Sequence, residues 1–465
     1  GYHTSISGDG KRIVLAPGYT GVLSNPNGIV SVRVYEDSIT DKAGSALIFK
    51  KELTNFTSIV KLTPDETISA NDRFGNPVAI DGNYAIIGSY LYDTSGYIDT
   101  GTVYIAKYEN SSWSIIQKIV STLSNLDNTE FGCSLGLSGD YAVIGERNGD
   151  IVDYNENSYT DAGVINVYKR DDTTWINQAR LTASDASDND TFGYSVAIDG
   201  EYIVAGAIYA DLVYNNEGLG YIFKRNGTSW TEEAKLTIST STEADYLGAS
   251  CAISGNYAVI GMIGSDNKYD NDGSVYVFLR DGSDWTEQAK LTASEAHIDE
   301  NFGLNVSIDN STKTLVVGCE LSENSGYPSN TSIGNVYVFV RNGTNWSEQA
   351  ILTASDGNTN DLFGSSVVVK ENIIIVGAKG YGEPQYNSAE DGAIYVYSRI
   401  NTAWTEIKKI TGISDENFGI SIDLDINEKN IIIGANTNSE YESNSGASYI
   451  YSYDIGWEEI AKLTE

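Results

Sequence analysis

The chain has 465 residues, with 29 Lys and Arg against 64 Asp and Glu, so its formal net charge is −35 at pH 7. Phosphate backbones and anionic membranes would repel such a chain, which excludes nucleic acid as a favoured partner and leaves cations, basic proteins and neutral glycans. Hydrophobic residues make up 41% of the chain, enough for a large core. No apolar run reaches the length of about 18 residues that a membrane span requires, so no membrane insertion is expected.

An internal repeat runs along the whole chain. Its marker is Phe-Gly followed by an apolar segment, and one copy has Leu-Gly at the same position. The markers begin at Phe74, Phe131, Phe192, Leu247, Phe302, Phe363 and Phe418. The chain start, "GYHTSISG", aligns with "GYSVAIDG" from Gly193. The markers predict eight repeats with the boundaries 1–73, 74–130, 131–191, 192–246, 247–301, 302–362, 363–417 and 418–465.

Each repeat contains four strand signals. In the copy that starts at Gly248 they are "GASCAIS", "YAVIGM", "GSVYVFLR" and "WTEQAKLT". The first is rich in small residues, as a crowded innermost strand requires. The second and third are continuously apolar, which indicates burial on both faces. The fourth alternates apolar and polar residues, which is typical of an outer edge strand. No helical period competes with this pattern.

Four-stranded antiparallel sheets stacked around an axis form a β-propeller. The sequence therefore predicts an all-β fold and a single propeller domain over residues 1–465. Eight blades are expected, with seven as the alternative if the irregular first repeat is an extension. The chain starts with an innermost strand and ends with an outermost one. We therefore expect every blade to come from one continuous segment, with no interlocking strand between the termini.

The segments "FGYSVAIDGEYIVAGA" and "GYIFKRNGTSWTEEAKLT" resemble the FG-GAP repeat of integrin-α-type propellers. The resemblance covers nearly the whole chain and implies a calcium-binding, adhesion-type propeller at a cell surface. Such propellers usually have seven blades. Their calcium loop, Asp-x-Asp-x-Asp-Gly-x-x-Asp between the first two strands, is missing here, so those sites cannot be transferred to this chain.

Antiparallel strands place successive connections on opposite faces of the propeller. The short turns between strands one and two and between strands three and four share a face that we call the floor. The long acidic connections after strands two and four share the opposite face, which we call the crown. Floor sequences such as "RNGTSW" are ordinary turn chemistry. Variable loops on a rigid scaffold usually carry binding, so the crown is the expected binding face.

Closely spaced carboxylates on a crown loop predict a calcium site at Asp266, Asp270 and Asp272, because calcium prefers six to eight oxygen ligands. Further acidic groups occur on two other crown loops, at Asp93 and Asp99 and at Asp150, Asp153, Glu156 and Asp161. A second set of carboxylates stands two residues before the marker: Asp72, Asp190, Asp245, Glu300, Asp361 and Glu416. Because this set recurs, we expect it to accept backbone N–H bonds rather than to bind metal.

The sequence lacks the residues of several reaction types. His3 and His297 are the only histidines and lie in distant repeats, so no histidine-based triad or zinc cluster is formed. No phosphate-binding or dinucleotide fingerprint occurs. Cys133, Cys251 and Cys319 lie in apolar strands and are expected to be free, buried thiols. We expect no enzymatic activity.

The leading interpretation is an extracellular or surface scaffold for binding or adhesion. One alternative is a structural subunit of a filament, surface layer or virion that contacts copies of itself. Another is a glycan-binding lectin or a glycan-active enzyme. Crown tyrosines are expected either to line glycan pockets or to pack loops together: Tyr92, Tyr97, Tyr154, Tyr159, Tyr209, Tyr214, Tyr269, Tyr327, Tyr381, Tyr386 and Tyr441.

Overall fold

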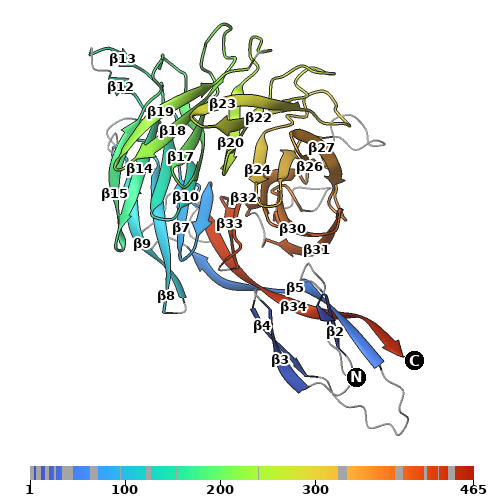
Figure 1. Ribbon diagram of the computed structural model, residues 1–465. Coiled ribbons are helices and arrows are strands. Elements are labelled where there is room, and N and C mark those ends of the chain that lie inside the picture. The colour runs from blue at the N-terminus through green and yellow to red at the C-terminus, as the bar shows by residue number, and fades with distance from the viewer. Residues whose placement is uncertain are drawn as a thin grey trace. The chain divides into compact units, whose positions relative to one another are not determined.

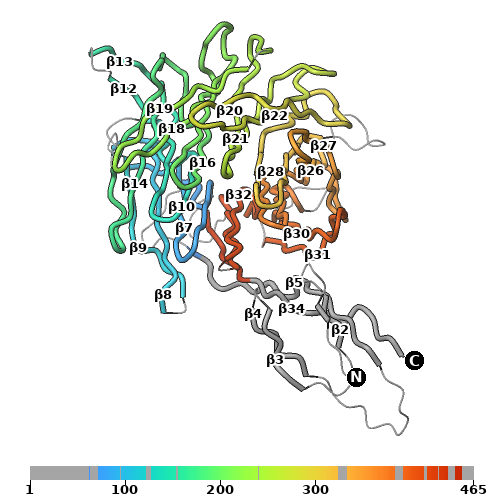
Figure 2. The backbone as a smooth tube through the Cα atoms, viewed as in Figure 1, coloured from blue at the N-terminus to red at the C-terminus, as the bar shows by residue number. Residues whose placement is uncertain are grey.

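The computed structural model describes residues 72–452 together with Leu62, apart from 95, 111, 122–126, 153–155, 239, 323–331, 383–390, 413–415, 428 and 438–445 (Figure 2). For the remaining residues near the two ends it gives strand positions alone. Contacts divide the chain into two compact units, Ser58–Tyr451 and Gly1–Thr57 with Ser452–Glu465. The assignment of residues 1–465 to a single domain stays a prediction.

The larger unit is a β-propeller of four-stranded antiparallel blades (Figure 1). Blade 1 contains β6 (Val78–Asp81), β7 (Tyr84–Ser89), β8 (Thr102–Glu109) and β9 (Ser112–Val120). Blade 2 contains β10 (Phe131–Ser138), β11 (Tyr141–Glu146), β14 (Val164–Asp171) and β15 (Thr174–Leu181), and its crown loop holds β12 (Ile151–Val152) and β13 (Ser158–Tyr159). Blade 3 contains β16 (Phe192–Asp199), β17 (Tyr202–Ala207), β18 (Leu219–Asn226) and β19 (Ser229–Leu236).

The next three blades repeat the same order. Blade 4 contains β20 (Leu247–Ser254), β21 (Tyr257–Met262), β22 (Ser274–Asp281) and β23 (Asp284–Leu291). Blade 5 contains β24 (Asn305–Asp309), β25 (Thr314–Cys319), β26 (Asn335–Asn342) and β27 (Asn345–Leu352). Blade 6 contains β28 (Phe363–Lys370), β29 (Ile373–Ala378), β30 (Ala393–Ile400) and β31 (Ala403–Thr411).

Blade 7 is built from both ends of the chain. Its strands are β32 (Phe418–Asp425), β33 (Asn430–Ala435), β34 (Ala447–Thr464) and β5 (Ser45–Leu62), hydrogen-bonded in that order. Leu62 of β5 is buried in one core cluster with Phe74 and Ile450. The expectation that no strand interlocks the termini was therefore wrong, because β5 supplies the strand that follows β34.

The ring closes after seven blades. Gly446 bridges Phe74 as Gly101 bridges Phe131 at the next junction, so blade 7 contacts blade 1 as the other neighbours contact each other. The leading count of eight was wrong and the alternative of seven is confirmed. Most of the expected first blade, residues 1–73, lies outside the described residues. Its remaining strands are β1 (Ser5–Ile6), β2 (Arg12–Leu15), β3 (Thr20–Asn25) and β4 (Gly28–Arg33).

Close backbone approach explains the small residues of the inner strands. A Cβ atom on Gly206 of β17 would lie 2.1 Å from the carbonyl oxygen of Gly248, the marker glycine of the next blade. That oxygen also accepts a 2.8 Å hydrogen bond from Ser195 Oγ. The same crown-side bond recurs wherever Ser or Asn follows the marker glycine by two residues. The donors are Ser134, Ser195, Ser250, Asn305, Ser366 and Ser421. At blade 1 the position holds Pro77, which has no donor.

A second ring of hydrogen bonds lies at the floor. The last residue of the first strand accepts the N–H of the hairpin in the next blade, as in the 2.6 Å bond from Gly255 N to Asp199 Oδ2. The acceptors are Asp81, Ser138, Asp199, Ser254, Asp309 and Asp425. The ring is interrupted between blades 6 and 7, where the corresponding residue is Lys370, whose side chain cannot accept. The floor hairpins thus combine turn chemistry with a tie between blades.

The marker phenylalanines anchor the core of each blade. Phe192 is fully buried and packs edge-on against Tyr221 of β18, with ring centroids 5.3 Å apart. The second strands are buried along their whole length in most blades, as in β17, whereas the outer strand β15 alternates. Blades also contact through a repeated stack in which Arg225 lies 4.6 Å from the ring centroid of Tyr141, next to Trp230. The burial expected for each strand type is therefore confirmed in these described strands.

Replacing Asp199 with alanine should lower the free energy of unfolding by about 1 kcal/mol, because the N–H of Gly255 loses a charged acceptor. Urea unfolding monitored by tryptophan fluorescence measures this change. Asp281→Ala is the matched control, since Asp281 is an exposed floor aspartate with no side-chain bond in the described structure. Equal effects of the two substitutions would show that the floor ring contributes nothing to stability.

Candidate binding face

Crown loops are fixed at their bases to the next blade. The loop of blade 3, residues 208–218, ends at Gly218, which bridges Leu247, and the N–H of Leu247 donates to Glu217 O at 2.9 Å. The N–H of Ala244 donates to Asn215 O at 2.9 Å. Corresponding bonds occur at the other fully described crown loops. These contacts give the described loops of blades 3 and 4 a defined shape, as a preformed binding face requires.

Buried carboxylates stand before the marker in every case that the sequence predicted, and three of them accept a backbone N–H from three residues earlier. Asp190 accepts Ser187 N at 2.7 Å and Asp361 accepts Asn358 N at 2.7 Å. Asp245 accepts the N–H of Thr242 in the same way. For these residues the predicted structural role is confirmed. Burial raises the pKa of Asp190 and of Asp361 to about 6.

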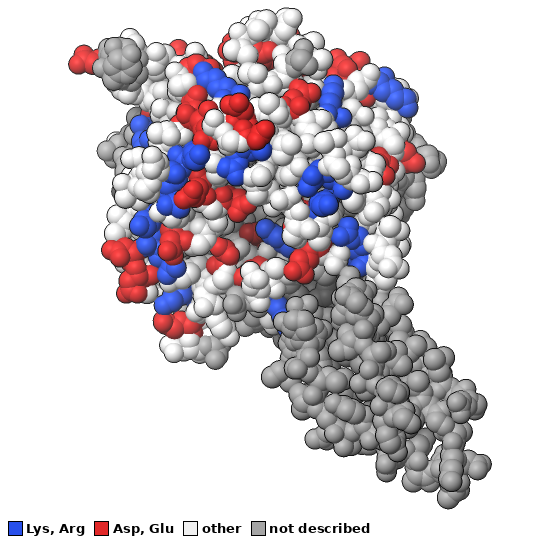
Figure 3. Space-filling model, in the orientation of Figure 1, with Lys and Arg blue, Asp and Glu red and all other residues white. Residues whose placement is uncertain are grey.

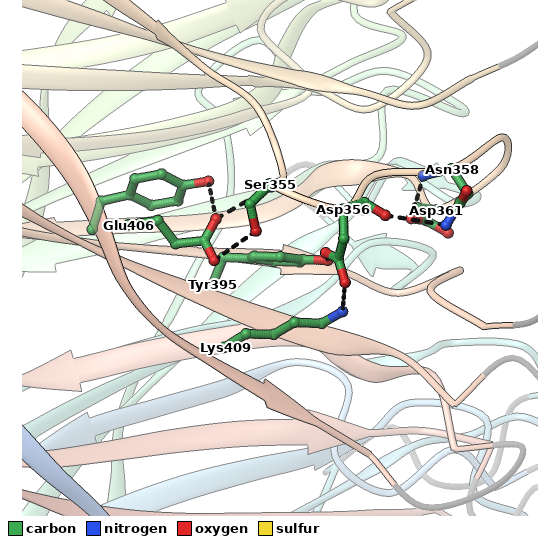
Figure 4. A network of polar contacts seen from close by, with 8 residues as sticks. Ser355, Asp356, Asn358, Asp361, Tyr395, Glu406 and Lys409 are labelled. Carbon is green, nitrogen blue, oxygen red and sulfur yellow. Dashed lines mark hydrogen bonds and ion pairs between the residues drawn. The ribbon is translucent and has the colours of Figure 1, made fainter.

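The link from blade 5 to blade 6 shows how these segments join neighbouring blades (Figure 4). The N–H and Oγ of Ser355 donate to Glu406 of β31 at 3.2 and 2.9 Å. Asp356 accepts the hydroxyl of Tyr395 at 2.8 Å and lies 2.6 Å from Lys409 Nζ. Ser184 and Asp185 make the equivalent contacts with Glu232 and Tyr221 in the link from blade 2 to blade 3. The link is thus a structural joint.

The residues of the predicted calcium site lie on the crown loop of blade 4, where hydrogen bonds occupy their oxygens. Asp272 is buried and accepts the N–H groups of Asn267, Lys268 and Tyr269 at 2.9, 2.7 and 3.0 Å. Asp266 accepts Asn271 N at 2.8 Å. Asp270 contributes its main-chain carbonyl, which accepts Asp299 N at 3.0 Å.

Backbone N–H groups thus donate to both oxygens of Asp272 and to one oxygen of Asp266, whereas Asp270 takes part through its main-chain carbonyl. Within the described ranges, no three acidic, histidine or cysteine side chains are grouped so as to hold a metal ion. The calcium site stays a prediction. In the two other acidic groups an aspartate also accepts a backbone N–H of its own loop. Asp150 accepts Asp161 N at 3.0 Å and Asp93 accepts Asp99 N at 2.8 Å. Asp153 lies outside the described residues.

The crown tyrosines divide into two classes. Tyr92 and Tyr381 pack loops, since Lys118 Nζ lies 3.8 Å from the first ring centroid and Lys409 Nζ lies 3.3 Å from the second. Others are exposed on the crown: Tyr209, Tyr214 and Tyr269. Four predicted tyrosines lie outside the described residues: Tyr154, Tyr327, Tyr386 and Tyr441.

An apolar tip projects from the crown loop of blade 3. Leu212, Val213 and Tyr214, which we call the crown tip, are 52%, 72% and 47% exposed. Glu217 is buried and its Oε1 accepts the N–H groups of all three, at 2.7 Å from Leu212 and 3.3 Å from Tyr214. The carboxylate fixes the backbone and leaves the apolar side chains in solvent. Sequence reasoning missed this feature, although the segment "DLVYNNEG" signals it by placing an apolar run in an acidic loop.

Arginine and tyrosine side chains gather on the crown side of blades 1 to 3, around the innermost strands. Arg147, directly after β11, forms an ion pair with Glu130 and lies 5.4 Å from the ring centroid of Tyr194. Tyr90 follows β7, and the charges of Arg73, Glu130 and Arg147 all act on it. We call Arg73, Tyr90, Glu130, Arg147 and Tyr194 the mouth cluster. Sequence reasoning missed this cluster, because no arginine or tyrosine of the cluster recurs at its own repeat position in the other blades.

Comparison with protein families identifies the repeat. The FG-GAP repeat model matches residues 56–106, 175–223, 230–278, 285–339 and 346–397, more than half of the chain. The chain belongs to the FG-GAP repeat family. The resemblance seen in the sequence is thereby confirmed. No curated protein matches the chain. FG-GAP propellers are typically binding domains that mediate protein–protein interactions, and they are typical of extracellular or surface proteins.

Two further observations concern the surface charge of this FG-GAP propeller and the type of its secondary structure. On the face shown in Figure 3, acidic and basic side chains are interspersed rather than gathered into a patch of one sign. No helix long and apolar enough to cross a membrane is found in the part of the chain that the structure describes.

The buried carboxylates give stability a defined pH dependence. Because the folded pKa values of Asp190 and Asp361 lie above the ordinary 3.8, the folded state binds protons more readily than the unfolded state. The free energy of unfolding should therefore rise as the pH falls from about 6 to about 4, by about 1 kcal/mol for each group. Chemical unfolding of wild type and of Asp190→Asn and Asp361→Asn at several pH values measures it.

The asparagine variants keep an acceptor for the loop N–H but cannot ionise, so each should flatten this part of the pH profile. Asp281→Asn, which removes an exposed charge of the same type, controls for the effect of net charge. A profile that stays as steep in Asp190→Asn and Asp361→Asn as in the control would contradict the assignment.

The role of Asp272 is separable from metal binding. Asp272→Ala leaves the N–H groups of Asn267, Lys268 and Tyr269 without their acceptor, and should lower the free energy of unfolding by about 2 kcal/mol. Because the loss concerns hydrogen bonds, it should be the same in a chelator and in millimolar calcium. Thermal unfolding of wild type and variant under both conditions tests this. A destabilisation seen only with calcium present would support the predicted calcium site instead.

Proposed function

We propose that the protein is a non-enzymatic binding scaffold of the cell exterior, or of a cell or virion surface, that holds a partner protein on its crown. The observation that carries the proposal is the crown tip. An apolar side chain that is ordered but exposed loses little conformational entropy when a partner covers it. Aromatic and aliphatic anchors of this kind dominate the energy of protein interfaces.

The scaffold supports this role by its rigidity. Two rings of hydrogen bonds tie the blades together, and Glu217 determines the backbone of the tip. A partner therefore meets a surface of fixed shape, at a loop that lies apart from the turns that stabilise the ring. Function in such proteins is located in loops on a rigid framework.

Net charge determines the type of partner that the crown favours. A chain of net charge −35 attracts basic proteins and repels nucleic acid and anionic membranes. Such attraction is screened by salt over about 8 Å at physiological ionic strength, so it affects the encounter more than the final contact. The bound state then depends on packing against Leu212, Val213 and Tyr214.

A second candidate function is that of a structural subunit that contacts its own copies. It is favoured by apolar side chains on the outer strands of two neighbouring blades. Ile116 and Val120 of β9 are 39% and 43% exposed, and Ile176 of β15 is 52% exposed. Edge strands with apolar residues facing solvent are sites where further chains associate. A partner bound at these blade edges would be a second copy of the propeller.

Site-specific photo-crosslinking separates the two functions. A benzophenone amino acid at position 213, applied to the protein in its native surroundings, should yield one discrete adduct with a protein of positive net charge. The adduct should disappear when Leu212→Ser and Tyr214→Ser are combined with the probe, and its yield should fall with added salt. The same probe at Asp281, on the floor, is the control.

Two results would contradict the proposal that the crown holds a partner protein. One is equal labelling at positions 213 and 281, which would show nonspecific contact. The other is an adduct of twice the chain mass from a probe at position 176 with none from position 213. That outcome would assign the protein to the structural class.

A further inference from the structure

The mouth cluster is built from equivalent positions of neighbouring blades. Arg73 and Glu130 each stand directly before a marker phenylalanine, whereas Tyr90 and Arg147 each follow the second strand. Tyr194 follows the marker Gly193. In a propeller these positions lie at one level around the crown end of the axis. Side chains that are far apart in the sequence therefore converge there.

The charges of the cluster are not balanced. Glu130 is shared between Arg147, with which it pairs, and Asn148, whose Nδ2 donates to its Oε1 at 3.4 Å. In the described part of the chain Arg73 forms no ion pair. Arg147 thus has a carboxylate partner and Arg73 has none there, in a protein whose acidic residues outnumber its basic ones by more than two to one. A local excess of positive charge against the sign of the whole chain is a feature that recognition of an anion would require.

The surroundings favour a carboxylate over a larger anion. Tyr90 and Tyr194 are largely buried phenols, and burial raises the pKa of both, so each keeps its hydroxyl proton. Guanidinium groups bind carboxylates through paired N–H donors, and neutral phenols add further donors. A polyanion would meet the repulsion of the whole chain, but a single carboxylate on a partner of positive net charge would not.

The cluster is continuous with the crown tip. Tyr209 opens the loop that carries Leu212, Val213 and Tyr214, and after burial it is among the groups that raise the pKa of Tyr194. Its ring packs edge-on against Tyr246, with centroids 5.8 Å apart. One partner could therefore place apolar side chains on the tip and a carboxylate in the mouth cluster.

We infer that the mouth cluster binds one Asp or Glu side chain of the protein held on the crown, with Arg73 as its main ligand and Tyr90 and Tyr194 as flanking donors. The inference rests on the proposed function for the source of the carboxylate. The binding chemistry itself can be measured without the partner, so each can fail without the other.

The test uses blocked amino acids and the intact chain. Saturation-transfer NMR with N-acetyl-aspartate amide should show binding in the millimolar range, and N-acetyl-asparagine amide should bind at least fivefold more weakly. Arg73→Gln should weaken the aspartate ligand at least fivefold. Lys313→Gln, which removes an exposed positive charge at a floor hairpin, should leave it unchanged. D-glucuronate serves as the acidic sugar and should bind no better than the aspartate ligand.

A second variant acts in the opposite direction. Glu130→Gln keeps an acceptor for Asn148 but removes the charge that competes for Arg147, so it should tighten the aspartate ligand at least twofold. This gain keeps the inference testable if Arg73→Gln misfolds. Equal binding of the two blocked amino acids, or no response to either substitution, would overturn it. Glucuronate binding tenfold tighter than the aspartate ligand would overturn the assignment to a protein side chain.

Discussion

The structure depends on the close approach of backbones at the inner edge of neighbouring blades. A glycine near the end of each second strand lies against the carbonyl of the next marker glycine, and an added Cβ would fall within 2.7 Å of that oxygen at every junction. At the junction that closes the ring, a Cβ added to Gly434 would lie 1.8 Å from Gly75 O. Side chains cannot enter this space, so the ring forms only if each blade presents glycine there. The serine side chains that donate to the carbonyl of the marker glycine lie in the same crowded space.

Much of the fold was predictable because the same constraint acts on each repeat. The burial of β17, the small residues of β16 and the alternation of β15 were all predicted from the sequence, since the same packing recurs in each repeat. The blade count was not, because it depends on which strands pair at the ends. The family matches begin at outer-strand positions such as Trp175 and Trp230, whereas the Phe-Gly marker lies at the innermost strand. Starting the repeat at that marker concealed the contribution of β5 to blade 7.

The candidate binding residues were harder to predict from the sequence than the fold. Asp190 and Asp361 were predicted correctly because a carboxylate recurs at this position in repeat after repeat, and in three of them it accepts the same backbone bond. Glu217 was missed because its bonds depend on the backbone of the loop, although Asp272 makes the same bonds one repeat later. Arg73 and Arg147 were missed because arginine does not recur at these positions in the other blades. In a repeat protein, residues that recur in every repeat build the scaffold, whereas residues that differ from the repeat pattern are the candidates for function. A single sequence shows an exception only as an irregularity, and its meaning depends on neighbours that the fold brings together.

The two interruptions in the rings of hydrogen bonds have a consequence for assembly. Pro77 removes the crown-side bond between blades 1 and 2, and Lys370 removes the floor bond between blades 6 and 7. Blades 2 to 6 are thus joined by both kinds of bond, and their chain is contiguous. Blades 7 and 1 are also joined by both kinds of bond, but blade 7 itself is completed only when β5 pairs with β34. Blades 2 to 6 can therefore fold first as an open arc. Blades 1 and 7 then close the ring once β34 is available to pair with β5.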